Sequence, residues 1–160
     1  MAEIITPAGP KKGWRPPGAE ELALMLPQYE IECLLGRGGM GAVYQGRQVE
    51  LDRPVAIKIL PADLDSDGHD FAGRFKLEAR AMARLKHPGI VTVYDFGQTA
   101  EGLLYFVMEF VAGVDVQHMI GREGRLHSAD AIAIAAHVCE ALHYAHSHGI
   151  IHRDIKPANV

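Results

Sequence analysis

Residues 152–159 read His152-Arg153-Asp154-Ile155-Lys156-Pro157-Ala158-Asn159, one residue before the end of a 160-residue sequence. The stretch combines a carboxylate that can act as a base (Asp154), a cation (Lys156) and an amide that can bind a metal ion (Asn159). These groups can orient a hydroxyl, neutralise a phosphate and supply an oxygen ligand for Mg²⁺, and transfer of a phosphoryl group uses all three. The stretch therefore predicts phosphoryl-transfer chemistry on a loop that Pro157 stiffens.

The residues before this loop predict a sheet followed by helices. Apolar and β-branched residues favour strands over 29–35, 42–47, 55–60, 90–96 and 103–110, and the turns between them are short. One apolar stripe predicts a helix over 71–85, which Pro88 and Gly89 follow. Further helices are expected over 115–120 and 129–147, with Ser128 as the N-cap of the second. The predicted fold class is α+β: a five-stranded antiparallel sheet with one helix, followed by the first helices of a helical lobe.

The same patterns predict the domain organisation. Residues 1–28 are rich in proline and glycine and are expected to form a flexible leader, with a short amphipathic turn over 19–25. Residues 29–111 form the strand-rich part, and residues 112–160 form the helical part. The helix over 129–147 is apolar around much of its circumference, so we expect that it needs burial on more than one side.

A glycine-rich stretch joins the first two predicted strands. Its residues are Gly36, Arg37, Gly38, Gly39, Met40 and Gly41. A dinucleotide-binding loop with similar glycine spacing would open a helix, whereas this one leads into a strand. Without side chains at the glycines, such a hairpin can lay its backbone N–H groups over the phosphates of a nucleotide. A plain glycine hairpin is the alternative interpretation.

Lys58 lies near the middle of an apolar strand, where a charged side chain needs a partner or an anionic ligand. Glu78 is beside the apolar stripe of the predicted helix and is therefore expected to point toward the sheet. An ion pair between Lys58 and Glu78 would aim the lysine at α- and β-phosphates. The alternatives are an edge-strand lysine and a helix-face glutamate, both in contact with water.

Residues 108–111 end the last predicted strand. Backbone groups of Met108, Glu109 and Val111 are placed to bond the edge of an adenine, and Val43 and Ala56 are expected to form an apolar roof over it. Nearby Asp115 is a candidate for a ribose hydroxyl, or alternatively a carboxylate that stabilises the start of a helix.

Composition and spacing argue against nucleic-acid binding, a histidine or cysteine metal site and a membrane span. The formal net charge of −4 argues against a nucleic-acid surface. Cys33 and Cys139 lack metal or redox spacing, which favours buried free thiols in a reducing compartment. The four histidines between residues 143 and 152 give only one pair on a common helix face, so we do not expect a metal site there. No apolar run is long enough to span a membrane, and a cytoplasmic location is expected unless a later segment provides an anchor.

Four motifs occur in the order that protein kinases show. They are Gly-Arg-Gly-Gly-Met-Gly-Ala-Val-Tyr (36–44), Val-Ala-Ile-Lys (55–58), the helix residue Glu78, and Gly-Ile-Ile-His-Arg-Asp-Ile-Lys-Pro-Ala-Asn (149–159). The chain resembles the N-terminal part of a eukaryotic-like bacterial serine/threonine protein kinase. Lys156, two residues after Asp154, is typical of the serine/threonine branch.

The resemblance implies a role for each matching position, with ATP and Mg²⁺ as cofactors and serine or threonine hydroxyls of proteins as acceptors. Asp154 would orient or deprotonate the acceptor hydroxyl, Lys156 would neutralise the transferring group, and Asn159 would bind Mg²⁺. Lys58, held by Glu78, would bind the phosphates. His152 would brace the loop and not carry protons.

The resemblance also implies segments that are not in this sequence. The D-F-G motif, the activation loop and the A-P-E motif lie beyond Val160 in the family. The sequence therefore predicts a piece that is inactive alone, exposes an apolar patch and associates. The alternative function is a truncated, catalytically inactive module that binds a nucleotide or a partner.

Overall fold

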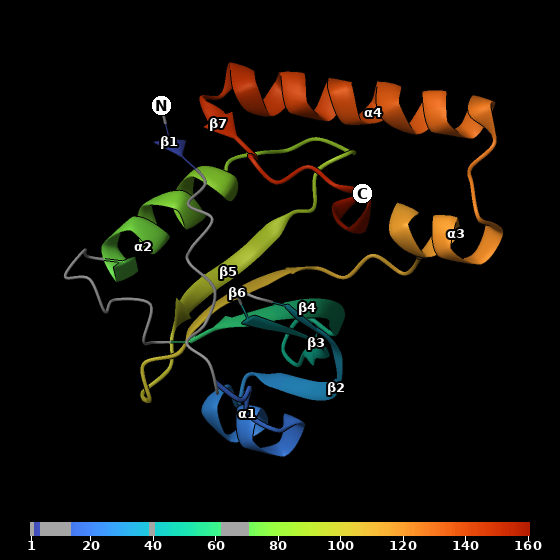
Figure 1. Ribbon diagram of the computed structural model, residues 1–160. Helices are drawn as coiled ribbons and strands as arrows, with labels where there is room; N and C mark the ends of the chain where they lie inside the picture. Colours follow the sequence, from blue (N-terminus) through green and yellow to red (C-terminus); the bar gives the residue numbers. More distant parts are fainter. Residues whose placement is uncertain (1, 4–13, 39–40, 62–70) are drawn as a thin grey trace. The chain divides into compact units, whose positions relative to one another are not determined.

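The computed structural model describes residues 2–3, 14–38, 41–61 and 71–160, and these divide into two compact units (Figure 1). One unit consists of the described part of Pro7–Ala83 together with Thr92–Phe110. The other consists of Arg84–Val91 and Val111–Val160, together with the short N-terminal strand. The chain passes from the first unit to the second between Phe110 and Val111.

The first unit is built on a five-stranded antiparallel sheet. Its strands are β2 (Tyr29–Gly38), β3 (Gly41–Gln48), β4 (Arg53–Leu60), β5 (Val93–Gln98) and β6 (Leu104–Glu109). Their order in the sheet is β2-β3-β4-β6-β5, so β4 pairs with β6 and β5 forms an edge. The α+β class and the five-stranded sheet are as predicted from the sequence.

The two faces of this sheet are covered by different helices. Helix α2 (Phe71–Met82) places Phe75 and Ala79 in a buried cluster with Leu104 and Phe106. The rings of Phe75 and Phe106 lie 4.3 Å apart, centre to centre. The expected apolar stripe of this helix is therefore its contact face, and the helix ends three residues earlier than predicted.

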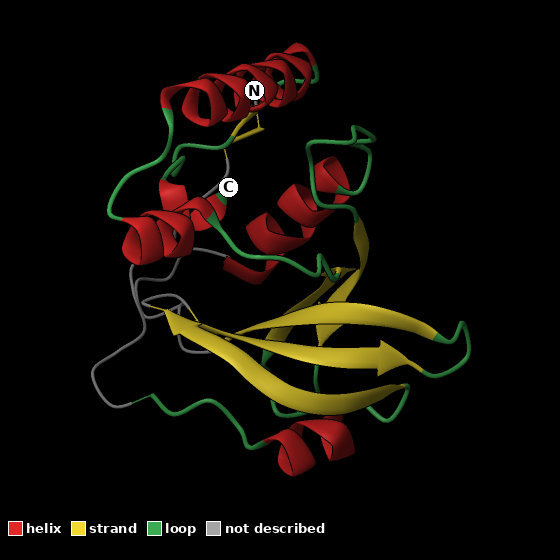
Figure 2. Cartoon of the chain, turned by 90° about the vertical axis from the view of Figure 1, so that its right-hand side faces the viewer, coloured by secondary structure: helices red, strands yellow, loops and turns green. Residues whose placement is uncertain are grey.

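Helix α1 (Ala19–Met25) covers the other face: the short amphipathic turn expected over 19–25 is confirmed, but it is docked on the sheet and is not part of a flexible leader. Leu22 and Leu26 are almost completely buried in a cluster with Tyr44, Ile57 and other residues of the sheet. Figure 2 shows this helix against the sheet at the bottom of the view. Apolar residues at i and i+4 on one helical turn are enough to dock it, so residues 19–26 belong to the core of the unit.

The second unit contains the short strands β1 (Ala2–Glu3) and β7 (Ile150–Ile151), which pair in parallel. It also contains α3 (Val116–Glu123), α4 (Ser128–Ser147) and the 3₁₀ turn η2 (Pro157–Asn159). The N-cap of α4 is His127, one residue before the predicted Ser128. Residues 84–91, which we expected in the strand-rich part, join this unit because the backbone N–H of Lys86 donates to the Tyr144 hydroxyl and His87 stacks on the Tyr144 ring.

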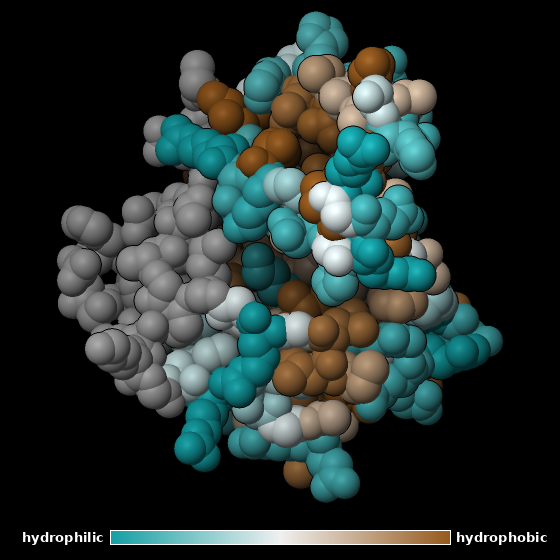
Figure 3. Space-filling model, turned by 45° about the vertical axis from the view of Figure 1, so that its right-hand side comes forward, coloured by the Kyte–Doolittle hydropathy of each residue, from teal (hydrophilic) through white to brown (hydrophobic). Residues whose placement is uncertain are grey.

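Helix α4 leaves much of its apolar surface uncovered. Among its residues only Ala141 and Ala145 are buried, and Ile132 is 70% exposed. Apolar residues are visible at the surface of the helical unit in the upper part of Figure 3. The expectation that this helix exposes apolar surface is confirmed.

Candidate active site

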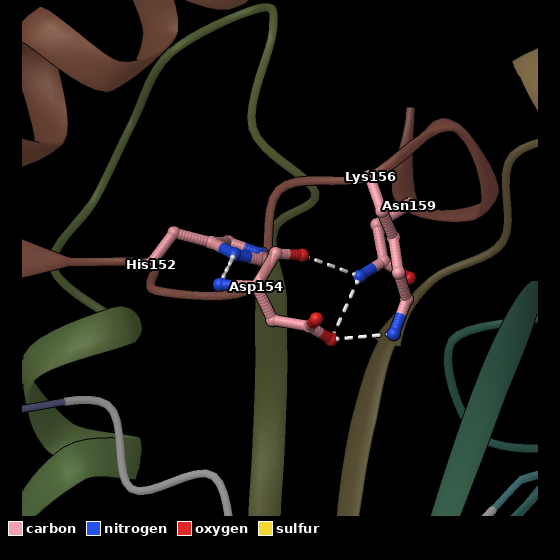
Figure 4. A network of polar contacts seen from close by, with 4 residues as sticks. All are labelled: His152, Asp154, Lys156 and Asn159. Atoms are coloured by element: carbon pink, nitrogen blue, oxygen red, sulfur yellow. Dashed lines mark hydrogen bonds and ion pairs between the residues drawn. The ribbon is translucent and has the colours of Figure 1, made fainter.

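The loop after β7 brings Asp154, Lys156 and Asn159 together (Figure 4). Nζ of Lys156 lies 2.8 Å from Oδ2 of Asp154. The amide nitrogen of Asn159 donates to the backbone oxygen of Asp154 at 2.8 Å and to its Oδ2 at 3.2 Å. The hydrogen bond from Lys156 is the largest cause that lowers the pKa of the Asp154 carboxyl below its ordinary value, so Asp154 is a carboxylate at neutral pH.

These contacts leave particular atoms for a substrate and a cation. Among the described residues, nothing bonds Oδ1 of Asp154, which can therefore accept a hydroxyl proton. The backbone oxygen of Asp154 only accepts hydrogen bonds, so the Asn159 atom that contacts it is the nitrogen. The carboxamide oxygen of Asn159 is consequently the atom that can bind a cation. Together with a nearby carboxylate it fits the oxygen ligands that Mg²⁺ prefers.

The backbone around Asp154 is held in an unusual conformation. Arg153 has a φ of 62°, in the left-handed region that a residue with a side chain seldom adopts. Nδ1 of His152 accepts a hydrogen bond from the backbone N–H of Asp154 at 3.3 Å. Pro157 begins the 3₁₀ turn that contains Asn159. His152 thus braces the loop, as expected from the sequence.

In the other unit, strand register places four predicted nucleotide-binding residues on one sheet face. Val43 of β3 lies opposite Lys58 of β4, and Ala56 of β4 lies opposite Met108 of β6. Residues directly opposite each other in antiparallel strands point to the same side, and so do residues two apart on one strand. Ala56 is buried, and the other three are partly exposed. The two apolar side chains proposed as a roof therefore flank Lys58.

Helix α2 packs on the face from which Lys58 projects. Lys58 is opposite Phe106, and Phe106 packs against Phe75 of α2. Glu78 adjoins the buried Ala79 on this helix, and both Lys58 and Glu78 are half-buried. This arrangement is compatible with an ion pair between Lys58 and Glu78, which remains a prediction.

Within the glycine-rich loop, the three described glycines differ in their surroundings. Added methyl groups at Gly36 and Gly38 would meet no described atom within 4 Å, whereas one at Gly41 would collide with the backbone oxygen of Ile59. Packing therefore explains why position 41 is a glycine, but it does not explain Gly36 or Gly38. A ligand that approaches the backbone closely would explain glycine at those two positions. Gly39 and Met40 lie outside the described residues.

Arg37 lies on the other face of the hairpin. It pairs with Ala42, whose side chain is buried under α1, while the neighbouring pair Gly36 and Val43 faces the Lys58 side. We expected the whole loop to bind nucleotide. The register separates the Arg37 side chain from the face that carries Lys58 and leaves only its backbone for that role.

At the end of β6, the backbone N–H of Glu109 is already hydrogen-bonded within the protein. The N–H of Glu109 donates to the backbone oxygen of Thr92 at 2.9 Å, and its carboxylate accepts from the N–H of Thr92 at 3.3 Å. The N–H of Glu109 is thus not the donor to an adenine. Val111 is exposed, so its backbone groups remain candidates.

Asp115 acts as the N-cap of α3. One carboxylate oxygen accepts from the backbone N–H of His118 at 2.8 Å, and the other lies 2.6 Å from Nδ1 of its ring. The backbone hydrogen bond is the largest cause that lowers the pKa of Asp115. The structure therefore shows the helix-capping alternative, and contact with a ribose stays a prediction.

Sequence reasoning missed the part played by residues 14–28. The hydroxyl of the buried Tyr44 donates to the backbone oxygen of Pro17 at 2.6 Å. The spacing of Leu22 and Leu26 was the available signal, since it marks one apolar face on a very short helix. The proline and glycine content of the flanking residues hid it.

Cys33 and Cys139 are exposed free thiols, so the expectation that they are buried is wrong. Two kinds of feature are absent from the described residues. These residues contain no group of three or more histidine, cysteine, aspartate or glutamate side chains that could hold a metal ion. None of their helices is long and apolar enough to cross a membrane.

Comparison with known proteins identifies the family. A family model for the protein kinase domain matches residues 29–160. The chain is 44% identical over 133 residues to serine/threonine-protein kinase pkn3 of Myxococcus xanthus, covering 83% of this chain and 24% of that protein. It is 47% identical over 136 residues to serine/threonine-protein kinase PknB of Mycolicibacterium smegmatis, covering 83% of this chain and 22% of that protein.

Solved structures give the same result. The chain aligns with the crystal structure of the Mycobacterium tuberculosis PknI kinase domain with a TM-score of 0.72 and 38% identity, over 83% of this chain and 54% of that one. The chain thus spans less than a quarter of the length of these two curated relatives and about half of the solved kinase domain. From its motifs, its fold and these relatives, the chain belongs to the protein kinase family, as the N-terminal part of a eukaryotic-like bacterial serine/threonine kinase domain.

Proposed function

We propose that the full-length protein transfers the γ-phosphoryl group of ATP to serine or threonine hydroxyls of proteins, and that this chain supplies the nucleotide-binding face and the catalytic loop. The observation that carries the proposal is the geometry of Asp154, Lys156 and Asn159. A carboxylate, a cation and a metal-binding amide within one short loop are suited to phosphoryl transfer.

In the proposed reaction, the oxygen of the serine or threonine hydroxyl attacks the γ-phosphorus. Oδ1 of Asp154 accepts the proton that this hydroxyl loses. The bond between that phosphorus and the oxygen bridging to the β-phosphate breaks, and ADP leaves with the bond's electron pair. Lys156 lies next to Asp154 and neutralises charge on the transferring group. Mg²⁺, when bound, offsets the negative charge of the phosphates, and the amide oxygen of Asn159 would be one of its ligands.

On the nucleotide-binding face, the proposed role of Lys58 is to bind the α- and β-phosphates. Its half-buried position between Val43 and Phe106 limits its motion, and Glu78 would keep it charged and aimed. Val43 and Ala56 would cover the adenine. The backbone at Gly36 and Gly38, where there is room for close approach, would cover the phosphates.

The test uses the full-length protein and a matched pair of lysines. Lys58→Met keeps an unbranched side chain of similar length in β4 and removes the charge. Lys76→Met makes the same change at an exposed position of α2. We expect phosphotransfer to fall by roughly a hundredfold or more in Lys58→Met and to stay unchanged in Lys76→Met. Wild-type rates from Lys58→Met would contradict the proposal.

A further inference from the structure

Helix α1 and the residues before it are built into the unit that carries the glycine-rich loop, although the matched kinase region begins only at residue 29. Leu22 of α1 is in the same buried cluster as Ala42 and Tyr44 of β3. The hydroxyl of Tyr44 donates to the backbone oxygen of Pro17 in buried surroundings. Figure 2 shows α1 below the sheet strands that it covers.

Strand β3 packs against α1 with one face and carries a proposed nucleotide-binding residue on the other. Ala42 and Tyr44 point toward α1, and Val43 between them points to the face of Lys58. The strand also begins at Gly41, the last residue of the glycine-rich loop. Contacts that fix Ala42 and Tyr44 from the α1 side therefore also fix Val43 and one end of the loop.

Burial is the main cause that raises the pKa of the Tyr44 hydroxyl. At the start of α1, the Glu21 carboxylate accepts from the backbone N–H of Gly18 at 3.3 Å. Gly18 directly follows Pro17, whose backbone oxygen accepts the hydrogen bond of the Tyr44 hydroxyl.

We infer that the segment Trp14–Leu26 positions the glycine-rich loop for ATP, through the buried hydrogen bond between Tyr44 and Pro17 and through the buried cluster that Leu22 shares with Ala42 and Tyr44. The inference rests on the proposed function. Ordering the loop before ATP arrives lowers the entropy cost of binding, so the segment strengthens ATP binding without touching the nucleotide. Tyr44 is a positioning residue in this account.

The test uses a single substitution in the full-length kinase. Tyr44→Phe keeps the buried ring and removes the hydroxyl that donates to Pro17. Tyr94→Phe is the matched control, because it makes the same change in β5, a strand that does not pair with β3.

We expect Tyr44→Phe to raise KM for ATP by about fivefold with little change in kcat, and Tyr94→Phe to change neither. An unchanged KM for ATP in Tyr44→Phe would overturn the inference.

Amide hydrogen exchange separates positioning from general destabilisation. In Tyr44→Phe, exchange should increase in the hairpin of β2 and β3 and not in the hairpin of β5 and β6, whose strands do not pair with β3. Equal increases in both hairpins would show a merely structural role and overturn the inference. This comparison needs no catalytic activity, so an inactive wild-type protein would contradict the proposed function while the exchange result still decides the role of the segment.

Discussion

Lys156 and Asp154 form an ion pair, with Nζ and Oδ2 2.8 Å apart, on the same loop as the amide of Asn159. The pair keeps Asp154 ionised through contacts to Oδ2, and Oδ1 is the oxygen proposed to accept the substrate proton. A proton acceptor and a charge-neutralising cation are thus set two residues apart before any substrate binds.

This pair predicts how the reaction depends on pH. The neighbouring Lys156 lowers the pKa of Asp154, so the carboxylate form persists below the ordinary carboxyl range. In the full-length kinase, Lys156→Met should raise that pKa and shift the acidic limb of kcat/KM to higher pH. It should also lower kcat by roughly a hundredfold, because the cation near the transferring group is lost. An acidic limb at the wild-type position in Lys156→Met would show that Lys156 does not set the ionisation of Asp154.

The glycines of the loop predict separable effects on nucleotide binding and stability. Gly36→Ala and Gly38→Ala have room for the added methyl group, so they should weaken ATP binding with little loss of stability. Gly41→Ala forces a methyl group against the backbone oxygen of Ile59 and should cost about 1–3 kcal/mol of unfolding free energy. Calorimetric ATP binding and urea unfolding of the full-length kinase variants measure the two effects.

Gly46→Ala is the control for this comparison. Its added methyl group would lie 2.5 Å from the backbone oxygen of Glu30, so it should destabilise the sheet as Gly41→Ala does. If Gly36→Ala destabilised the protein as much as Gly46→Ala and left ATP affinity intact, Gly36 would be a packing glycine.

Tyr29 predicts a loss of stability at alkaline pH. Its hydroxyl donates to Oδ2 of Asp95 at 3.2 Å, which joins the two edge strands of the sheet, and burial followed by Asp95 raises its pKa. The folded state therefore holds the proton more tightly than the unfolded state, whose tyrosine pKa is about 10. The resulting stabilisation is present below that pH and is lost as the pH rises through the folded-state pKa.

Substitution of Tyr29 by phenylalanine tests this account. Tyr29→Phe should lower the unfolding free energy near neutral pH by about 1 kcal/mol and remove this part of the alkaline decline. Tyr94→Phe should change neither, because the Tyr94 ring still lies under the guanidinium of Arg53. Urea unfolding of both variants near neutral pH and at about pH 11 decides the point, and parallel declines in wild type and Tyr29→Phe would refute it.

The exposed apolar surface of α4 predicts that a protein consisting of residues 1–160 alone associates with itself. Ile132 is 70% exposed on a helix with little buried surface. Replacing it with a charged residue, Ile132→Glu, should lower the weight-average mass seen in sedimentation. Ala131→Glu adds the same charge on the same turn and should have a smaller effect. A monodisperse wild-type monomer would contradict the prediction.

Much of the fold and site followed from the sequence because several signals were local. The strands of the sheet and the apolar stripe of α2 were readable from spacing, and Lys58 stood out as a charge in an apolar strand. The spacing of Leu22 and Leu26 marks an apolar face on α1, but the surface on which that face docks was not readable, because it depends on Tyr44 reaching Pro17 across 27 positions of sequence. The face occupied by Arg37 was likewise set by strand register, which no short motif encodes.

The most direct test of the central claim is phosphotransfer by the full-length protein, comparing wild type with Asp154→Asn. The protein is incubated with ATP, Mg²⁺ and a general protein acceptor, and the phosphorylated residues are identified by mass spectrometry. The account predicts phosphoserine or phosphothreonine with the wild type and a loss of at least about a hundredfold in Asp154→Asn, with ATP binding retained. Equal phosphorylation by Asp154→Asn would contradict it.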